Sequence, residues 1–207
     1  MQKKIAVIND LSGYGRCSLT VAIPVLSVMG HQCCPVPTAI LSNHTEFPVY
    51  FFDDYTEKMT AYTDKWKELG LSFDAVATGF LGSEAQIEIV MDMIRKLESE
   101  ETFVVVDPVM GDHGHAYETY TPEMCEQMKE LVCMADIVLP NVTECCILTD
   151  TPYKKENWTR RELLNMAMML RLMGAKSVVI TGVREGSYYT NVVLERGQME
   201  AKFIRTR

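Results

Sequence analysis

Residues 104–114 read VVVDPVMGDHG, and this stretch decides how the rest of the chain is interpreted. Three consecutive valines are typical of a strand that is buried on both faces. Asp107 follows directly, and Pro108 disfavours a helical conformation at Asp107, so the chain should leave the strand extended. Asp112 lies five residues further on, between a glycine and a histidine. The stretch therefore predicts a buried strand that ends in a loop with two carboxylates.

The rest of the chain repeats the alternation of apolar runs with helical patterns. Apolar runs predict strands over 3–9, 33–41, 73–79, 102–107, 135–141 and 176–182. Helical spacing predicts helices over 16–30, 55–69, 83–100 and 121–134, from Val142 onward, and over 159–175. Segments 187–195 and 199–205, joined by Arg-Gly-Gln, predict a closing hairpin. This pattern indicates an α/β fold of three layers, with a mainly parallel central sheet and helices on both faces.

Several local signals mark where these helices begin and end. Ser83 and Thr121 are suitable N-caps, and Pro122 suits the first helical position. Gly30 and Gly70 follow two of the helical patterns, where a residue with positive φ often ends a helix. The long segment 42–54 is predicted to be a polar and aromatic loop.

Length and composition limit the classes of protein that remain. The 207 residues are 47% hydrophobic and 23% charged, which suits one globular domain over 1–207. The net charge of −8 and the lack of a basic stripe argue against nucleic-acid binding. There is no secretory leader pattern and no apolar run near the ~20 residues of a membrane helix. Seven cysteines without a CxxC motif predict reduced, mostly buried thiols in a cytoplasmic protein.

Polar residues and glycines follow nearly every predicted strand. In folds with parallel strands, ligands bind at the carboxyl ends of the strands. In chain order these positions hold Asn9, Asp10, Ser12, Gly13 and Gly15; Ser42 to Thr45; 78–83; Asp107 and Asp112; Asn141 and Glu144; Thr181 and Gly182. Turns favour the same residue types, so the whole set, and no single member, indicates a ligand site.

Two other kinds of site fit the motifs poorly. Gly13-x-Gly15 would open a dinucleotide fingerprint, but Ser18 stands at the third glycine and no acid follows until Glu46. A nicotinamide-dependent reductase would rest on this motif alone, and the chain has no P-loop motif. His113 and His115 raise the possibility of zinc, but alternate loop positions beside carboxylates do not match a closed zinc site.

Asn141-x-x-Glu144 has two interpretations. As a capping box, Asn141 would cap a helix and Glu144 would return a hydrogen bond to it. As a functional site, Glu144 would orient hydrated Mg²⁺, and both roles could coexist. Asp107, Asp112 and Glu144 together are three carboxylates from two predicted strands. They suit a hard cation that bridges phosphates.

Five motifs in this order resemble those of pyridoxal kinases, which belong to the ribokinase-like superfamily. They are SNHTEFP (42–48), ATGFLGS (77–83), DPVMGDHG (107–114), LPNVTE (139–144) and VVITG (178–182). The resemblance covers essentially the whole chain. It implies a ribokinase-like kinase domain that uses ATP and Mg²⁺, with a monovalent cation as an optional further ion, and that forms a homodimer.

The resemblance also implies roles for individual residues. On the phosphate side, Asp107 and Asp112 would lie near the ATP phosphates and their cations, Asn141 and Glu144 would position Mg²⁺ and phosphate, and Thr181 with Gly182 would belong to the nucleotide-side loop. On the vitamin side, Thr45 and Phe80 would lie at the ring, and the spacing leaves the remaining ring contact open between Asp10 and Ser12. Phe80 replaces a tyrosine of many relatives, and Leu139 replaces a threonine.

One motif of these kinases is missing. Relatives carry a late Gly-Thr-Gly-Asp motif whose aspartate acts as catalytic base, and no Gly-x-Gly-Asp occurs in these 207 residues. We therefore expect no catalytic base in the chain. Two interpretations stay open: the chain is a kinase lacking its C-terminal part, or it is a non-catalytic protein that binds the ligands.

The activity implied by the resemblance is transfer of the γ-phosphoryl group of ATP to the 5′-hydroxymethyl group of pyridoxal, pyridoxine or pyridoxamine. This reaction salvages vitamin B6 to pyridoxal 5′-phosphate. The alternative within the superfamily is the hydroxymethylpyrimidine kinase of thiamine synthesis, and the motif SNHT favours the pyridoxal side.

Overall fold

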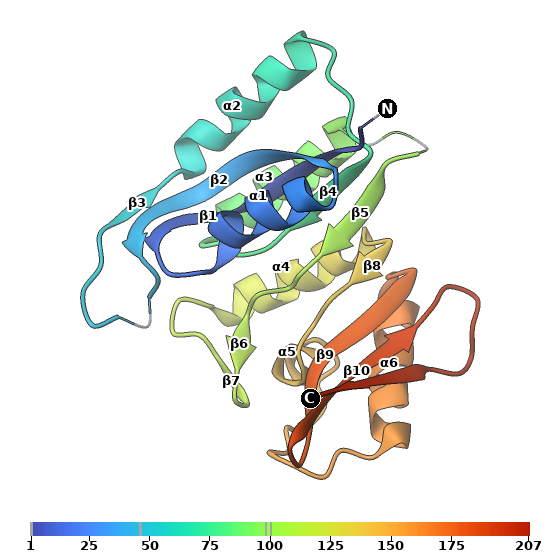
Figure 1. Ribbon diagram of the computed structural model, residues 1–207. Coiled ribbons are helices and arrows are strands. Elements are labelled where there is room, and N and C mark those ends of the chain that lie inside the picture. Colours follow the sequence, from blue (N-terminus) through green and yellow to red (C-terminus); the bar gives the residue numbers. More distant parts are fainter. Residues whose placement is uncertain (1, 46, 98, 100) are drawn as a thin grey trace. The chain divides into compact units, whose positions relative to one another are not determined.

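The computed structural model describes residues 2–45, 47–97, 99 and 101–207. The chain forms two compact units, Met1–Val104 (unit 1) and Val105–Arg207 (unit 2). Figure 1 shows unit 1 in blue to green and unit 2 in green to red.

Unit 1 contains four strands in the order β4-β1-β2-β3. Their bounds are β1 (Lys4–Tyr14), β2 (Gln32–Asn43), β3 (Phe52–Asp54) and β4 (Ala75–Thr78). The long strand β1 runs parallel to both β2 and β4, whereas β3 pairs with β2 in the antiparallel direction. The carboxyl ends of β1, β2 and β4 therefore meet at one edge of this part of the sheet.

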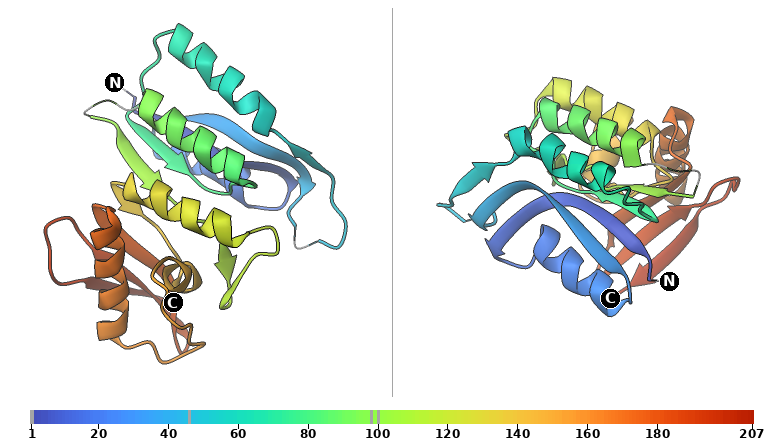
Figure 2. Two further views of the ribbon diagram at one scale, coloured as in Figure 1. Left: turned by 180° about the vertical axis from the view of Figure 1, so that it is seen from behind. Right: turned by 90° about the horizontal axis from the view of Figure 1, so that it is seen from above.

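Helices cover both faces of the unit 1 strands. α1 (Ser18–Val28) lies on one face of β1 and β2, and α2 (Thr56–Glu68) and α3 (Glu84–Leu97) lie on the other (Figure 2). α3 buries Ile87, Val90, Met91 and Ile94 completely or nearly so, which is the i, i+3, i+4, i+7 spacing of one helical face. The Ser83 hydroxyl accepts the Gln86 N–H at 3.2 Å, as an N-cap does.

Unit 2 contains strands in the order β5-β8-β9-β10-β11. Their bounds are β5 (Phe103–Val106), β8 (Ile137–Val138), β9 (Ser177–Glu185), β10 (Tyr188–Leu194) and β11 (Lys202–Thr206). β5, β8 and β9 are parallel, and β10 pairs with β9 and β11 in the antiparallel direction. A separate two-stranded ribbon joins β6 (Gly111–Asp112) to β7 (His115–Ala116).

Three helices complete unit 2: α4 (Pro122–Cys133), α5 (Val142–Leu148) and α6 (Arg160–Met173). The Thr121 side chain caps α4 by accepting the Met124 N–H at 3.1 Å. α6 begins with a capping box formed by Thr159 and Glu162 and lies against β9 and β10. These caps confirm the predicted start of α4 and place the start of α6 within one residue of its predicted position.

The structure confirms the predicted α/β class with a mainly parallel sheet and a closing hairpin, but it corrects several boundaries. β1 extends to Tyr14, so Asp10 and Ser12 lie within the strand and not in a loop after it. β9 extends to Glu185, so the strand predicted over 176–182 continues past Thr181 and Gly182 and does not end at them. Backbone pairing continues past the apolar residues in both cases. The short strands β3, β6 and β7 were not predicted.

All seven cysteines are free thiols. The expectation that most of them are buried is wrong, because only Cys145 and Cys146 are buried and Cys133 is exposed. No helix among the described residues combines the length and the apolar character needed to span a bilayer.

Candidate active site

Asp10 and Ser12 form a buried polar pair in β1. Their exposed fractions are 7% and 1%, and the Ser12 hydroxyl donates to the Asp10 carboxylate at 2.9 Å. Side chains two residues apart in a strand share one face. The spacing left the ring contact open between Asp10 and Ser12, and the structure places the two side chains together.

Asn9 connects the end of β1 to the loop after β4. Its side-chain oxygen accepts the backbone N–H groups of Asp10 and Phe80, each at 3.0 Å. Gly79 leaves room for this contact, because a Cβ at Gly79 would lie 2.2 Å from the Asn9 amide nitrogen. Asn9 therefore positions Phe80. Asn9 was among the predicted strand-end residues, but no role was predicted for it, although the glycine at the end of β4 was a signal of this close approach.

Thr45 and Phe80 are the other two residues predicted to contact the ring. Thr45 follows β2 and is exposed, whereas Phe80 is half-buried and its carbonyl accepts the Thr38 hydroxyl at 3.0 Å. His44 reaches back to the end of β1, since a Cβ at Gly15 would lie 2.5 Å from its ring. These contacts bring the loop after β2 to the end of β1.

Glu144 is the centre of the second group of predicted residues, in unit 2. It is 3% exposed and forms a capping box with Asn141 at the start of α5. One carboxylate oxygen accepts the Asn141 N–H at 2.8 Å, and the other accepts the Met110 N–H at 3.2 Å. The Asn141 side chain also donates to the Gly111 carbonyl at 2.8 Å. The capping box is therefore confirmed, and the same two side chains hold the loop after β5.

Asp107 and Glu144 form an electrostatically coupled pair. Burial raises the pKa of Asp107 to about 6. The pKa of Glu144 is raised to about 8, mainly by burial and also by the nearby charge of Asp107, against the lowering effect of the backbone N–H donors. Asp107 is partly exposed and Glu144 is buried, and two carboxylates near one another in such surroundings are costly to ionise unless a proton or a cation joins them. The pair therefore favours a cation.

Asp112 is placed differently from Asp107 and Glu144. Its carboxylate accepts the His113 N–H at 2.7 Å and lies 3.6 Å from the His113 ring nitrogen Nε2, and both side chains are largely exposed. Within the described ranges no three His, Cys, Asp or Glu side chains are close enough to hold a metal ion. Of the three carboxylates predicted to bind a cation, only Asp107 and Glu144 are therefore brought together. Two suffice for Mg²⁺, which keeps several waters and takes one or two carboxylates besides phosphate oxygens.

Thr181 and Gly182 lie beside Asn141. Thr181 forms a parallel bridge with Asn141, and its N–H donates to the Pro140 carbonyl at 2.8 Å. Gly182 has a φ of +66° and donates its N–H to the Asn191 side chain at 3.1 Å. Residues that follow β5 and β8 and a residue of β9 are thereby brought together at the carboxyl ends of parallel strands.

Tyr120 is a buried residue near Glu144 that the sequence did not single out. It is 7% exposed, and its hydroxyl has no hydrogen-bond partner among the described residues. Burial raises the pKa of Tyr120 above its ordinary value, and the charges of Cys125 and Glu144 raise it further. Nothing in the sequence around Tyr120 distinguishes it from a core aromatic residue.

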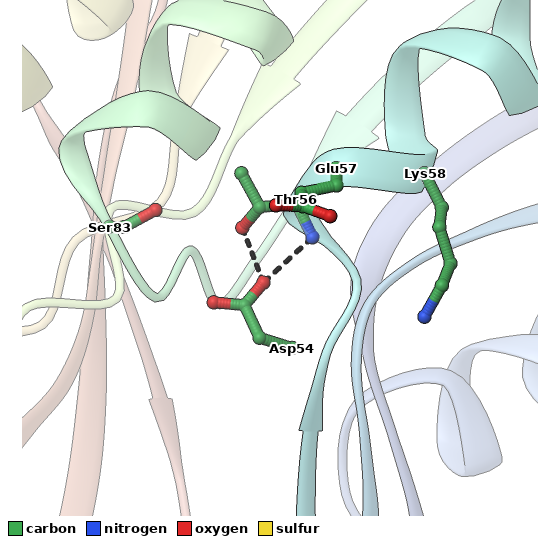
Figure 3. A pocket seen from close by; sticks show the side chains of 5 residues that line it. All are labelled: Asp54, Thr56, Glu57, Lys58 and Ser83. Atoms are coloured by element: carbon green, nitrogen blue, oxygen red, sulfur yellow. Dashed lines mark hydrogen bonds between the residues drawn. The ribbon is translucent and has the colours of Figure 1, made fainter.

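A separate pocket of about 390 Å³ lies where α2 and α3 begin (Figure 3). It is lined by Asp54, Thr56, Glu57, Lys58 and Ser83. Only Ser83 belongs to the predicted strand-end set, as the last residue of 78–83. The Asp54 carboxylate accepts both the N–H and the hydroxyl of Thr56, and the Gln86 amide also contacts it. These contacts organise the start of α2, so we assign the pocket no chemistry.

The strand ends define the class of protein as an α/β protein with acidic and other polar residues, among them Asp107 and Glu144, at the carboxyl ends of parallel strands. Comparison with known proteins specifies the family. The model of the phosphomethylpyrimidine kinase family matches residues 22–207, so the chain belongs to this family.

Solved structures and curated relatives agree with this assignment. The crystal structure of a candidate phosphomethylpyrimidine kinase from Bacteroides thetaiotaomicron in its rhombohedral form is 42% identical, with a TM-score of 0.95, and the match covers 99% of this chain and 70% of that one. Its orthorhombic form with pyridoxal is 43% identical, with a TM-score of 0.90, over 95% of this chain and 70% of that one. The pyridoxal kinase of Dictyostelium discoideum is 29% identical over 190 residues, which are 88% of this chain and 61% of that protein. The chain thus spans about 61% of the length of this curated relative, and the predicted resemblance to pyridoxal kinases is confirmed.

Proposed function

We propose that this chain belongs to an ATP-dependent kinase that phosphorylates the 5′-hydroxymethyl group of pyridoxal, pyridoxine or pyridoxamine. Residues 1–207 are then part of one ribokinase-like kinase domain. The observation that carries the proposal is the pair of the partly exposed Asp107 and the buried Glu144, beside Asn141 and Thr181 at the carboxyl ends of parallel strands. The protein from B. thetaiotaomicron that was crystallised with pyridoxal supports the choice of substrate.

The proposal gives the phosphate and cation roles to unit 2. Asp107 and Glu144 would hold hydrated Mg²⁺, and Asn141 and Thr181 would contact the phosphates. Bound Mg²⁺ supplies positive charge against the phosphate oxygens of ATP. The exposed Asp112 contributes from the short strand β6, and Gly182 allows the close approach of the nucleotide.

The proposal gives recognition of the vitamin ring to unit 1. The Asp10 carboxylate, oriented by Ser12, accepts a hydrogen bond from the ring, and Phe80 provides an apolar surface for it. Thr45 adds a hydroxyl from the loop after β2. Phosphoryl transfer needs little covalent help from a protein, so positioning and charge carry most of the catalysis. No residue of this chain is assigned to accept the proton of the substrate hydroxyl.

Hydroxymethylpyrimidine kinase is the second candidate, because the family model carries the name of phosphomethylpyrimidine kinase. Both substrates present a hydroxymethyl group on a nitrogen heterocycle. A competition assay with Mg-ATP, the three B6 vitamers and hydroxymethylpyrimidine separates the two. Preferential phosphorylation of a vitamer supports the proposal, and preferential phosphorylation of the pyrimidine replaces it.

Calorimetry distinguishes catalysis from binding alone. If the protein binds pyridoxal and Mg-ATP but transfers no phosphate, it is a ligand-binding protein and the proposed catalysis is wrong. If it binds neither ligand, both the catalytic and the binding assignments fail.

We also propose a homodimer, dependence on a monovalent cation, and a cytoplasmic location. The seven free cysteines support a reducing compartment. Sedimentation velocity tests the dimer, and activity in potassium compared with sodium or tetramethylammonium salts tests the monovalent cation.

A further inference from the structure

A second concave surface lies in unit 2, away from the predicted site. It has a volume of about 440 Å³ and lies between the last turn of α6, the link from α6 to β9, and the turn between β10 and β11. Its lining residues are Met168, Arg171, Leu172, Ala175, Lys176, Arg196 and Met199. Ala175 and Lys176 precede β9, so the pocket lies at the start of this strand, whereas Asn141 bridges Thr181 near its middle.

The chemistry of this lining is unusual for the protein. Three of its side chains are cationic and none is acidic, although the whole chain carries a net charge of −8. Leu172 and Met199 are 87% and 70% exposed. Large apolar side chains grouped at an exposed concave surface and flanked by polar ones are typical of a binding site.

The cations retain donors for a ligand. The Arg171 guanidinium donates to the Gln198 carbonyl, which fixes the turn against α6 and leaves its other N–H groups. Lys176 pairs with Asp136 at 2.6 Å and is half exposed. The Arg196 side chain makes no ion pair with any described residue, so it is the cation most available to an anion.

We propose that this pocket binds a small amphipathic anion, in which a phosphate or carboxylate group contacts Arg196 and Lys176 and an apolar body lies on Met168, Leu172 and Met199. The inference does not depend on the proposed kinase activity. A charged head alone would leave the apolar lining exposed, and a neutral body alone would leave Arg171 and Arg196 without an anionic partner among the described residues, since only Lys176 already pairs with a carboxylate. A ligand with both parts pairs with the cations and covers the apolar side chains.

Methyl NMR of the protein labelled with ¹³C-methyl methionine tests the proposal directly. Met168→Leu and Met199→Leu variants assign the two reporting signals. Phenyl phosphate and benzoate are the probes, and they distinguish a phosphate from a carboxylate head. We expect saturable shifts of both signals with at least one probe.

Variants of Arg196 and Arg161, and ligands that lack one part of the proposed anion, test the proposal. Arg196→Glu should weaken the binding at least ~tenfold, and the milder Arg196→Gln should weaken it less. Arg161→Glu, at the exposed other end of α6, makes the same change in charge and should have no effect. The proposal is overturned if Arg161→Glu weakens binding as much, if benzyl alcohol binds as well, or if inorganic phosphate produces the same shifts, which means an adventitious ion only. Shifts that follow protein concentration and not the probe would instead indicate self-association and would also overturn it.

Discussion

At the scale of single residues, Glu144 connects stability to pH. Its pKa is raised from 4.5 to about 8, so the folded state binds a proton that the unfolded state has released between these values. The contribution of Glu144 to stability is therefore largest at low pH and is lost as the pH rises through about 8. Asp107, raised to about 6, adds a fall of the same sign at lower pH.

We predict that Glu144→Gln flattens this pH dependence. Without Mg²⁺, the wild-type protein should lose at least ~1 kcal/mol of unfolding free energy between pH 6 and pH 8.5, since each pKa unit corresponds to about 1.4 kcal/mol. The variant cannot ionise at position 144 and should lose less. Denaturant unfolding at the two pH values measures both, and Mg²⁺ should reduce the loss in the wild type because it favours the charged carboxylates. Equal losses in both proteins would mean that Glu144 is not the titrating group.

Removing the hydroxyl group of Tyr120 should not lower the stability of the protein, unlike most substitutions in a core. Its buried hydroxyl lacks a partner among the described residues, and such a group costs about 1–3 kcal/mol. Tyr120→Phe should therefore leave the stability unchanged or raise it by up to ~1 kcal/mol. Tyr62→Phe is the matched control, since the Tyr62 hydroxyl donates to the Pro35 carbonyl at 2.9 Å and its loss should destabilise. Thermal unfolding of both variants checks the contrast.

At the scale of elements, two capping boxes allow helix capping to be separated from function. Asn141 caps α5 beside Asp107 and Glu144, whereas Thr159 caps α6. Replacing either cap by alanine should cost about 1 kcal/mol. Only Asn141→Ala should also raise the concentration of Mg²⁺ needed for half-maximal ATP binding, measured by calorimetry. If both variants bind Mg-ATP like the wild type, Asn141 is a structural cap and nothing more.

The β6–β7 ribbon depends on a glycine. A Cβ at Gly111 would lie 2.3 Å from the His115 carbonyl oxygen, which is backbone and cannot move cheaply. Gly111→Ala should therefore destabilise the protein by roughly 2–4 kcal/mol, a size typical of steric conflict in a packed region. Gly186→Ala provides the control: φ is +63° but no atom lies within 4 Å of its Cβ, so its cost should be near 1 kcal/mol. Equal unfolding midpoints for the two variants would contradict the steric account.

Local patterns predicted some elements and missed others for physical reasons. The capping box of Asn141 and Glu144 can be predicted from the sequence because the two residues are three positions apart. Asp10 and Ser12 were assigned to a loop because polar residues rarely continue a buried strand, yet pairing with β2 carries β1 on to Tyr14. β6 and β7 have two residues each, which is too short for any periodicity to appear.

At the scale of the whole molecule, the fold class followed from alternation alone, but the two compact units did not. No change of composition marks the division at Val104 and Val105, and it falls within the strand β5. The contacts of Asn9 with Phe80 and of Glu144 with Met110 also join residues 71 and 34 positions apart. Such pairings depend on tertiary structure, and no local pattern specifies them.

The reactivity of the cysteine thiols shows whether the protein is folded. Burial raises the pKa of Cys145 well above its ordinary value and that of Cys146 to about 11, whereas Cys133 is exposed. Because the thiolate is the reactive form, Cys145 and Cys146 should react with a disulfide reagent only as the protein unfolds. All seven cysteines should react in denaturant. Mass spectrometry of the labelled peptides checks the order, and rapid native labelling of Cys145 would contradict its burial.

The bonds from Glu144 to the amides of Met110 and Asn141 have a consequence for amide exchange with solvent. Both amides lie outside regular strands and helices, where deuterium normally enters within seconds. A buried carboxylate holds them, so they should exchange as slowly as amides in the neighbouring strands. Two slow amides in otherwise fast segments would then serve as a spectroscopic marker of the state of this carboxylate in solution.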